Sequence, residues 1–63
     1  MQVFNVSGMT CSHCERAVTQ AIQALDPQAQ VQVDLAAGTV QVQSSASEQA
    51  IREAIGEEGY QVN

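Results

Sequence analysis

Apolar side chains recur at every second position in the middle of this 63-residue chain, which is the period of a strand buried on one face. Two such runs follow one another closely, over residues 30–35 and 40–43. The segment between them contains Gly38, whose flexible backbone suits the tight turn that joins paired strands. The centre of the chain is therefore predicted to be a β-hairpin. Its alternating apolar residues are Val31, Val33, Leu35, Val40 and Val42.

Two other segments place apolar residues three and four positions apart, which is the spacing of an amphipathic helix. The first covers residues 14–25, and Asp26-Pro27 ends it because a residue before proline avoids helical backbone. The second is predicted to begin with a capping box formed by Ser45 and Glu48, and to end at glycines. The helical apolar residues are Cys14, Val18, Ala21, Ile22, Leu25, Ala50, Ile51, Ala54 and Ile55, and the glycines are Gly56 and Gly59.

Short alternating runs also open and close the chain, over residues 2–7 and 60–63. The predicted order is strand, helix, strand, strand, helix, strand, which is typical of an α+β ferredoxin-like βαββαβ sandwich. In this fold a four-stranded antiparallel sheet carries two helices on one face, and a glutamine-rich face stays in contact with water. No internal linker or repeat divides the sequence, so we expect a single domain over residues 1–63.

The composition limits the classes of function. Seven acidic residues face two arginines, so the net charge is -5, which disfavours nucleic acid and anionic membranes and favours a basic patch on another protein. A chain of this length cannot enclose a deep catalytic cleft, and we expect no enzyme. No apolar run is long enough to span a bilayer and no leader precedes the first strand, which favours a cytoplasmic location where thiols stay reduced.

Both cysteines, the only histidine and one of the two methionines lie in the six residues from Met9 to Cys14. The cysteines stand at the start of a predicted helix, where free backbone N–H groups and the helix dipole favour thiolates. Two thiolates can hold a soft ion such as Cu(I), or can close on each other as a disulfide. A structural zinc site needs four ligands, and this chain has no second cysteine pair. Soft-metal binding and redox chemistry both remain open at this point.

The predicted topology brings a second segment to the cysteine loop. The first and last strands are antiparallel neighbours in a βαββαβ sheet, so Ser7-Gly8 at the end of the first strand lies beside Gly59-Tyr60 at the start of the last. We therefore expect the loop and Tyr60 to meet at one end of the molecule.

One motif extends over most of the chain. It comprises Gly8-Met9-Thr10-Cys11-Xaa-Xaa-Cys14, then Val18, Ala21-Ile22 and Leu25, and finally Gly59-Tyr60. This motif resembles that of the heavy-metal-associated domain family, and more narrowly that of the small bacterial copper chaperones. The resemblance implies that Cys11 and Cys14 hold Cu(I) and pass it by ligand exchange to the soluble metal-binding domain of a copper-transporting P-type ATPase.

The same resemblance suggests what surrounds the cysteines. Members of the family also bind Zn(II), Cd(II) or Hg(II), but Thr10 stands where zinc exporters often have an acidic residue, which favours copper. The thioether of Met9 is a candidate auxiliary donor, but the resemblance places Met9 in the core beneath the loop, and it places the ring and hydroxyl of Tyr60 near the thiolates. His13 is expected to face solvent, and it stays a candidate third ligand in a copper-bridged homodimer.

Two alternatives accompany the copper chaperone. One is a metal-binding domain cut from a larger heavy-metal P-type ATPase, although a chain that begins at its first strand and ends at its last favours a freestanding carrier. The other is a thiol–disulfide redox protein that uses the CxxC pair. A thioredoxin-like fold needs more residues than this chain has and a different active-site loop, so the redox protein is the weaker hypothesis.

Overall fold

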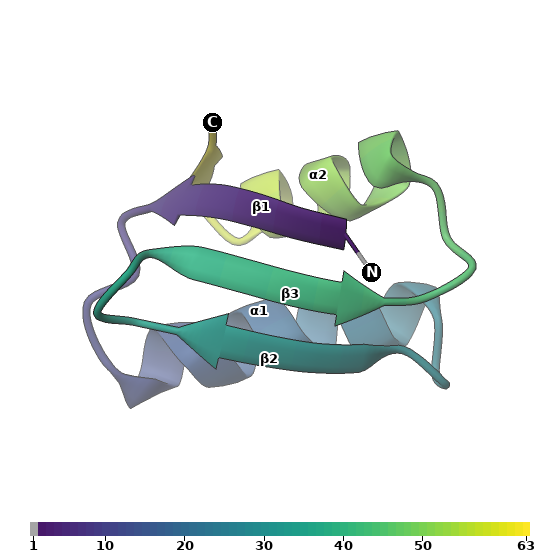
Figure 1. The fold of residues 1–63 in the computed structure, drawn as a ribbon, viewed down its shortest axis with the longest axis horizontal. Coiled ribbons are helices and arrows are strands. Elements are labelled where there is room, and N and C mark those ends of the chain that lie inside the picture. Colours follow the sequence, from purple (N-terminus) through teal and green to yellow (C-terminus); the bar gives the residue numbers. More distant parts are fainter. Residues whose placement is uncertain (1) are drawn as a thin grey trace.

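The computed structural model describes residues 2–63 and contains the elements in the predicted order (Figure 1). Four antiparallel strands form one open sheet, and both helices lie on one face of it. The predicted α+β βαββαβ sandwich is therefore confirmed. Met1, the first residue of the predicted domain, lies outside the described residues. The elements are β1 (Gln2–Ser7), α1 (Ser12–Leu25), β2 (Gln30–Asp34), β3 (Thr39–Gln43), α2 (Glu48–Glu57) and β4 (Gln61–Val62).

The strand order β2-β3-β1-β4 places the first and last strands side by side. Val6 pairs with Val62 and Ser7 pairs with Gln61 in antiparallel register, and the backbone N–H of Asn63 donates to the carbonyl oxygen of Asn5 at 2.7 Å. The end of β1 therefore lies beside the start of β4, as the topology predicted. This pairing fixes where the residues just before β4 approach the loop that follows β1.

The core lies between the inner face of the sheet and the apolar stripes of the two helices. Val18 and Ile22 of α1 are fully buried, and so are Ile51 and Ile55 of α2, because each pair is one helical turn apart on the same face. The outer face of the sheet is polar apart from the exposed Val3, and Gln32 pairs with Gln41 across β2 and β3. The other buried core residues are Phe4, Val6, Met9, Ala29, Val40 and Val42.

The predicted apolar stripe of α1 was wrong at Leu25, which the helical spacing placed in the core. This residue is 44% exposed, because α1 ends at it and the chain turns away at Asp26 and Pro27. Ala29, which the helical spacing does not single out, is buried at 4% exposure. The last residue of α1 therefore projects past the core instead of packing into it.

The start of α2 differs from the predicted capping box. Ser47 is the N-cap residue, and its side-chain oxygen accepts a hydrogen bond from the backbone N–H of Ala50 at 3.1 Å. Ser45 is exposed and lies two residues too early in the chain, because α2 begins at Glu48. The prediction chose the wrong serine of a serine-rich connector. At the other end, Gly56 lies inside α2 and only Gly59 follows it.

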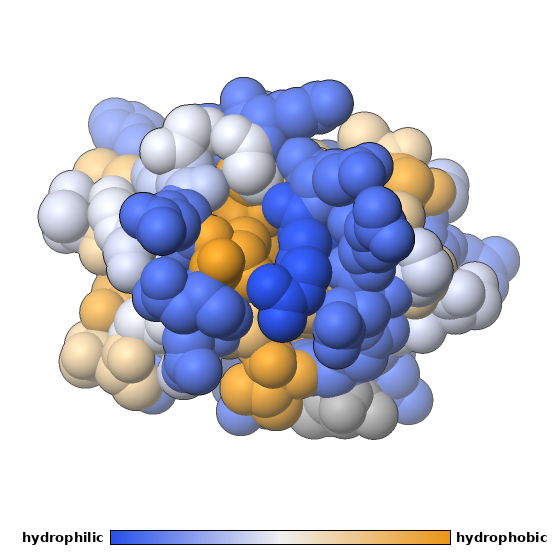
Figure 2. All heavy atoms as spheres, turned by 90° about the horizontal axis from the view of Figure 1, so that it is seen from above, coloured by the Kyte–Doolittle hydropathy of each residue, from blue (hydrophilic) through white to orange (hydrophobic). Residues whose placement is uncertain are grey.

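The edge formed by β1 and α2 is closed by a side chain as well as by β4. From above, Figure 2 shows polar residues around a hollowed apolar area on this side of the molecule. The guanidinium of Arg52 lies 5.8 Å from the centroid of the Phe4 ring and 3.6 Å from a carboxylate oxygen of Glu48. The long side chain of Arg52 thus covers part of the core that the two-residue strand β4 leaves open.

Candidate metal centre

The two cysteines are held at the junction between β1 and α1. Gly8 takes a positive φ of 98° at the end of β1, and Met9 then packs into the core at 7% exposure and anchors the loop. Cys11 is the N-cap residue of α1 with an extended backbone, and Cys14 lies in the first turn. The backbone N–H of Cys14 donates to the carbonyl oxygen of Cys11 at 3.0 Å. This turn brings both thiols to the same end of the helix.

The thiol groups are close enough to share one ion. Their Sγ atoms are 3.7 Å apart, and both cysteines are free. Metal–sulfur bonds of about 2.3 Å allow two sulfurs of one site to be up to about 4.6 Å apart, so a metal needs little movement of the pair. Cys11 is exposed and Cys14 is half-buried, so an incoming ligand reaches the pair from the Cys11 side.

The pKa of Cys14 is lowered, and Tyr60 is the largest cause. A hydrogen bond with the Tyr60 hydroxyl, supported by backbone groups of Thr10 and Cys11, lowers the pKa of Cys14 to about 6. The same hydrogen bond, together with partial burial and nearby negative charge, raises the pKa of Tyr60 to about 12. At neutral pH Cys14 is therefore a thiolate and the Tyr60 hydroxyl keeps its proton. The thiolate is the form of cysteine that binds metals.

The structure brings together some of the residues singled out in the sequence and leaves others apart. Cys11, Cys14 and Tyr60 meet at one end of the molecule, whereas Met9 is buried in the core and His13 is exposed on α1. Within residues 2–63 there is no group of three or more histidine, cysteine, aspartate or glutamate residues that could hold a metal ion. The candidate ligand set in one chain is therefore the cysteine pair.

Sequence reasoning placed Ser7-Gly8 beside Gly59-Tyr60 but did not identify how closely the Tyr60 ring approaches Gly8. A Cβ atom at Gly8 would lie 3.4 Å from Cδ1 of the Tyr60 ring, so the glycine leaves room for the ring beside the loop. The signal available in the sequence was a glycine placed directly after a strand, which marks a special backbone conformation but not its neighbour.

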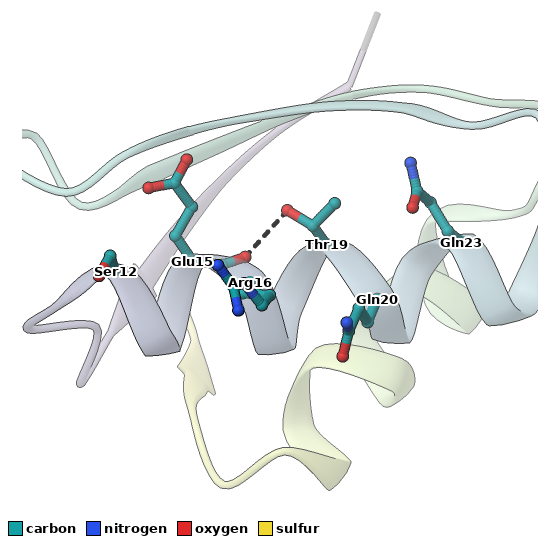
Figure 3. Close-up of a pocket in the computed structure, with 6 residues that line it drawn as sticks. All are labelled: Ser12, Glu15, Arg16, Thr19, Gln20 and Gln23. Carbon is teal, nitrogen blue, oxygen red and sulfur yellow. Dashed lines mark hydrogen bonds between the residues drawn. The ribbon is translucent and has the colours of Figure 1, made fainter.

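A polar groove starts beside the cysteine loop and follows α1 (Figure 3). Its volume is about 450 Å³, and Glu15 and Arg16 contribute opposite charges to it. Figure 3 shows the row of Glu15, Thr19 and Gln23 pointing away from Arg16 and Gln20, with the Thr19 hydroxyl donating to the Glu15 carbonyl oxygen at 2.9 Å. The groove offers hydrogen-bonding groups next to Cys11. Its lining residues are Ser12, Glu15, Arg16, Thr19, Gln20 and Gln23.

A pair of free cysteines at a helix N-terminus, one exposed and one half-buried, on an open-faced βαββαβ sandwich, is an arrangement whose chemistry suits a soft metal ion. The chain belongs to the heavy-metal-associated domain family, which it matches over residues 3–61.

Known proteins of the same size are similar to the chain over nearly its whole length. The copper chaperone CopZ of Staphylococcus aureus is 38% identical over 64 residues, which cover 97% of this chain and 94% of that protein. The structure of the copper chaperone Atx1 from Synechocystis PCC6803 in its Cu2 form superposes with a TM-score of 0.97 at 38% identity, and covers all of both chains. A structure described as CopZ metallochaperone superposes with a TM-score of 0.92 at 33% identity, over 98% of this chain and 97% of that one.

The hydrogen bond between Tyr60 and Cys14 predicts the pH dependence of thiol reactivity. The rate at which iodoacetamide alkylates Cys14 is expected to rise with pH through a midpoint of about pH 6, because the pKa of Cys14 is lowered to that value. In a Tyr60→Phe variant the main cause of the lowered pKa is gone, and the midpoint is expected to move up toward that of an ordinary thiol. Mass spectrometry of the modified peptides measures both rates, and an unchanged midpoint in the variant would contradict the assignment.

The lowered pKa also links folding stability to pH. The folded chain releases the Cys14 proton more readily than the unfolded chain, so the stabilisation is complete above about pH 9 and is lost as the pH falls through about 6. A Cys14→Ser variant lacks this group, and its stability should change less over the same interval in urea titrations.

Proposed function

We propose that this chain is a copper chaperone that binds Cu(I) through Cys11 and Cys14 and passes it to another protein by exchange of thiolate ligands. The observation that carries the proposal is the pair of free thiols 3.7 Å apart, with Cys11 exposed and Cys14 held toward the thiolate form. The relatives named copper chaperone support it, since they share at least a third of their residues with this chain over almost its full length.

The chemistry of the donors favours Cu(I) over harder ions. Thiolate sulfur is a soft ligand that selects Cu(I), and two such ligands are sufficient for this ion, whereas structural zinc sites take four. Zn(II), Cd(II) and Hg(II) are also thiophilic, and they are competitors for the pair instead of its expected cargo. An open site with two ligands suits a carrier, because an incoming thiolate can bind the metal before a resident one leaves.

The proposed acceptor is the soluble metal-binding domain of a copper-transporting P-type ATPase, in the cytoplasm. The net charge of -5 favours an acceptor with basic residues around its own cysteines, since opposite charges steer encounter. The groove beside Ser12 supplies hydrogen-bonding groups for the acceptor, with Arg16 and Glu15 as its charged residues. None of the helices described between residues 2 and 63 is long and apolar enough to cross a membrane.

Transfer kinetics test the proposal. The chain is loaded with Cu(I) under anaerobic, reducing conditions and mixed with increasing concentrations of a metal-free heavy-metal-associated domain from a copper-transporting ATPase. We expect the transfer rate to increase with acceptor concentration, because the metal moves within a complex of the two proteins. A rate that does not depend on acceptor concentration would mean release into solution and would contradict a chaperone function.

A further inference from the structure

A carboxylate joins two loops at the end of the molecule away from the cysteines. Figure 1 shows that α1 ends, and that the chain between β3 and α2 turns, at the end where β1 begins, whereas the loop between β1 and α1 lies at the other end. Asp26 is the C-cap residue of α1, and Ser44 is the first residue of the connector between β3 and α2, residues 44–47. The Ser44 hydroxyl donates to Oδ2 of Asp26 at 2.5 Å, so this hydrogen bond links two segments that are distant in the sequence.

The same two side chains also hold the backbone on either side of this bond. The second carboxylate oxygen of Asp26, Oδ1, accepts from the backbone N–H of Gln28 at 3.1 Å. Oγ of Ser44 accepts from the backbone N–H of Ala46 at 3.0 Å. The carbonyl oxygen of Ala46 in turn accepts from Nε2 of Gln2 at 3.2 Å. A chain of hydrogen bonds therefore runs from the loop before β2, through the carboxylate, to the connector and the start of β1.

The segments that surround the carboxylate carry no opposite charge. The last turn of α1 has no basic residue, and residues 2–4, 28–30 and 43–46 contain no titratable side chain. The first charged residue after the connector is Glu48, and the ion pair found among residues 2–63 joins it to Arg52 of the same helix. The described partners of the carboxylate are therefore hydrogen-bond donors without a cation.

The hydrogen bond from Ser44 favours the ionised carboxylate. It is the largest cause that holds the pKa of Asp26 below its ordinary value of 3.8, and the N–H of Gln28 adds to it. Because the folded chain holds the carboxyl proton less tightly than the unfolded chain, the stabilisation is complete above about pH 4 and is lost as the pH falls through the lower, folded-state value. A hydrogen bond to an ionised group is roughly twice as strong as one between neutral groups, so protonation weakens the link.

We propose that Asp26 is a latch for this end of the molecule: its ionised carboxylate holds the connector against the end of α1, and protonation or removal of the carboxylate lets residues 44–47 open while the rest of the fold stays closed. The connector suits local opening, because it contains no strand or helix and because Ser45 and Ser47 are exposed. The latch does not depend on the proposed copper binding.

Asp34 provides a matched control. Its carboxylate also accepts a backbone N–H from the loop that follows its own element, that of Ala37 at 3.0 Å. Within residues 2–63 no hydrogen bond from a distant segment reaches this carboxylate. Asp26→Ala and Asp34→Ala therefore both remove a local loop contact, and only the first removes the link to the connector. A difference between the two variants isolates the latch from the loss of a loop contact.

Hydrogen exchange at the Ala46 amide measures opening of the connector, because this N–H is bonded to Ser44. In NMR near neutral pH we expect Asp26→Ala to speed the exchange of Ala46 about tenfold relative to that of Ile22, the order expected when a hydrogen bond to a charged group is lost. Ile22 is fully buried, so its amide reports global unfolding. Asp34→Ala should leave the ratio of the two rates unchanged. If Asp26→Ala accelerated Ala46 no more than Ile22, the loss of stability would be global and the proposal would be overturned.

An acid titration tests the latch without a substitution. We expect the amide proton shifts of Gln28 and Ala46 to move with one midpoint below 3.8, because Ser44 passes the change in charge on to Ala46. In Ser44→Ala the Ala46 shift should lose this transition, and the midpoint at Gln28 should move up. An Ala46 shift that does not follow the Gln28 shift in the unchanged chain would overturn the proposal, even if Asp26→Ala does not fold.

Discussion

Cys14→Ser is expected to abolish stoichiometric Cu(I) binding. The loss of affinity should be well beyond the roughly 10–100-fold loss that follows when a residue hydrogen-bonded to a metal ligand is changed. The substitution removes one of two soft donors, and the hydroxyl of serine is a hard ligand that Cu(I) does not favour. Cys11→Ser should have the same effect. Titration with Cu(I) against a competing chelator under anaerobic, reducing conditions measures the affinity.

Two neighbours of Cys14 serve as controls for this experiment. Ser12 and His13 lie between the cysteines and are exposed. Ser12→Ala and His13→Ala should therefore keep one-to-one binding in the monomer, and a large loss in His13→Ala would make the histidine a ligand. If Cys14→Ser bound copper as tightly as the unchanged chain, the cysteine pair would not be the site.

Ile22→Ala is expected to remove most of the folding stability. Ile22 is fully buried between the helices and the sheet, and truncating such a side chain costs about 2–5 kcal/mol. A domain of 63 residues has roughly 3–9 kcal/mol in total, at about 0.05–0.15 kcal/mol per residue. Urea unfolding followed by circular dichroism measures the difference.

Leu25→Ala is the control for Ile22→Ala, because Leu25 belongs to the same predicted apolar stripe but is 44% exposed. We expect this substitution to cost less than about 1 kcal/mol, in the range of surface changes. Equal losses in the two variants would mean that the end of α1 packs into the core after all.

The order of elements could be predicted from the sequence because each one has a clear period. The hairpin combines strict alternation with Gly38, whose φ is 70° in the turn, and both features are local. The ends of elements were harder to predict, because they depend on tertiary contacts. The cap of α2 is Ser47 because α2 begins at Glu48, while Ser44 donates to a carboxylate oxygen of Asp26, the residue that follows α1, at 2.5 Å. Such a contact between distant segments leaves no periodic signal.

The parts of the candidate site that depend on local sequence and on strand order could also be predicted. Cys11 and Cys14 are adjacent in the sequence, and the strand order was sufficient to bring Tyr60 to them. The contact between Gly8 and Tyr60 depends on the register of β1 with β4 and on one positive φ, neither of which a single sequence specifies. The ligand role of the cysteine pair, and the parts assigned to Met9 and His13, stay predictions.

Competition between metals tests most directly whether the cysteine pair is a Cu(I) site. The reduced chain is offered one equivalent of Cu(I) together with an excess of Zn(II) in the absence of oxygen, and the bound metals are counted after gel filtration. We predict one Cu(I) per chain, no retained zinc, and loss of the bound copper when both cysteines are replaced by serine. Preferential retention of zinc by the unchanged chain would contradict the account.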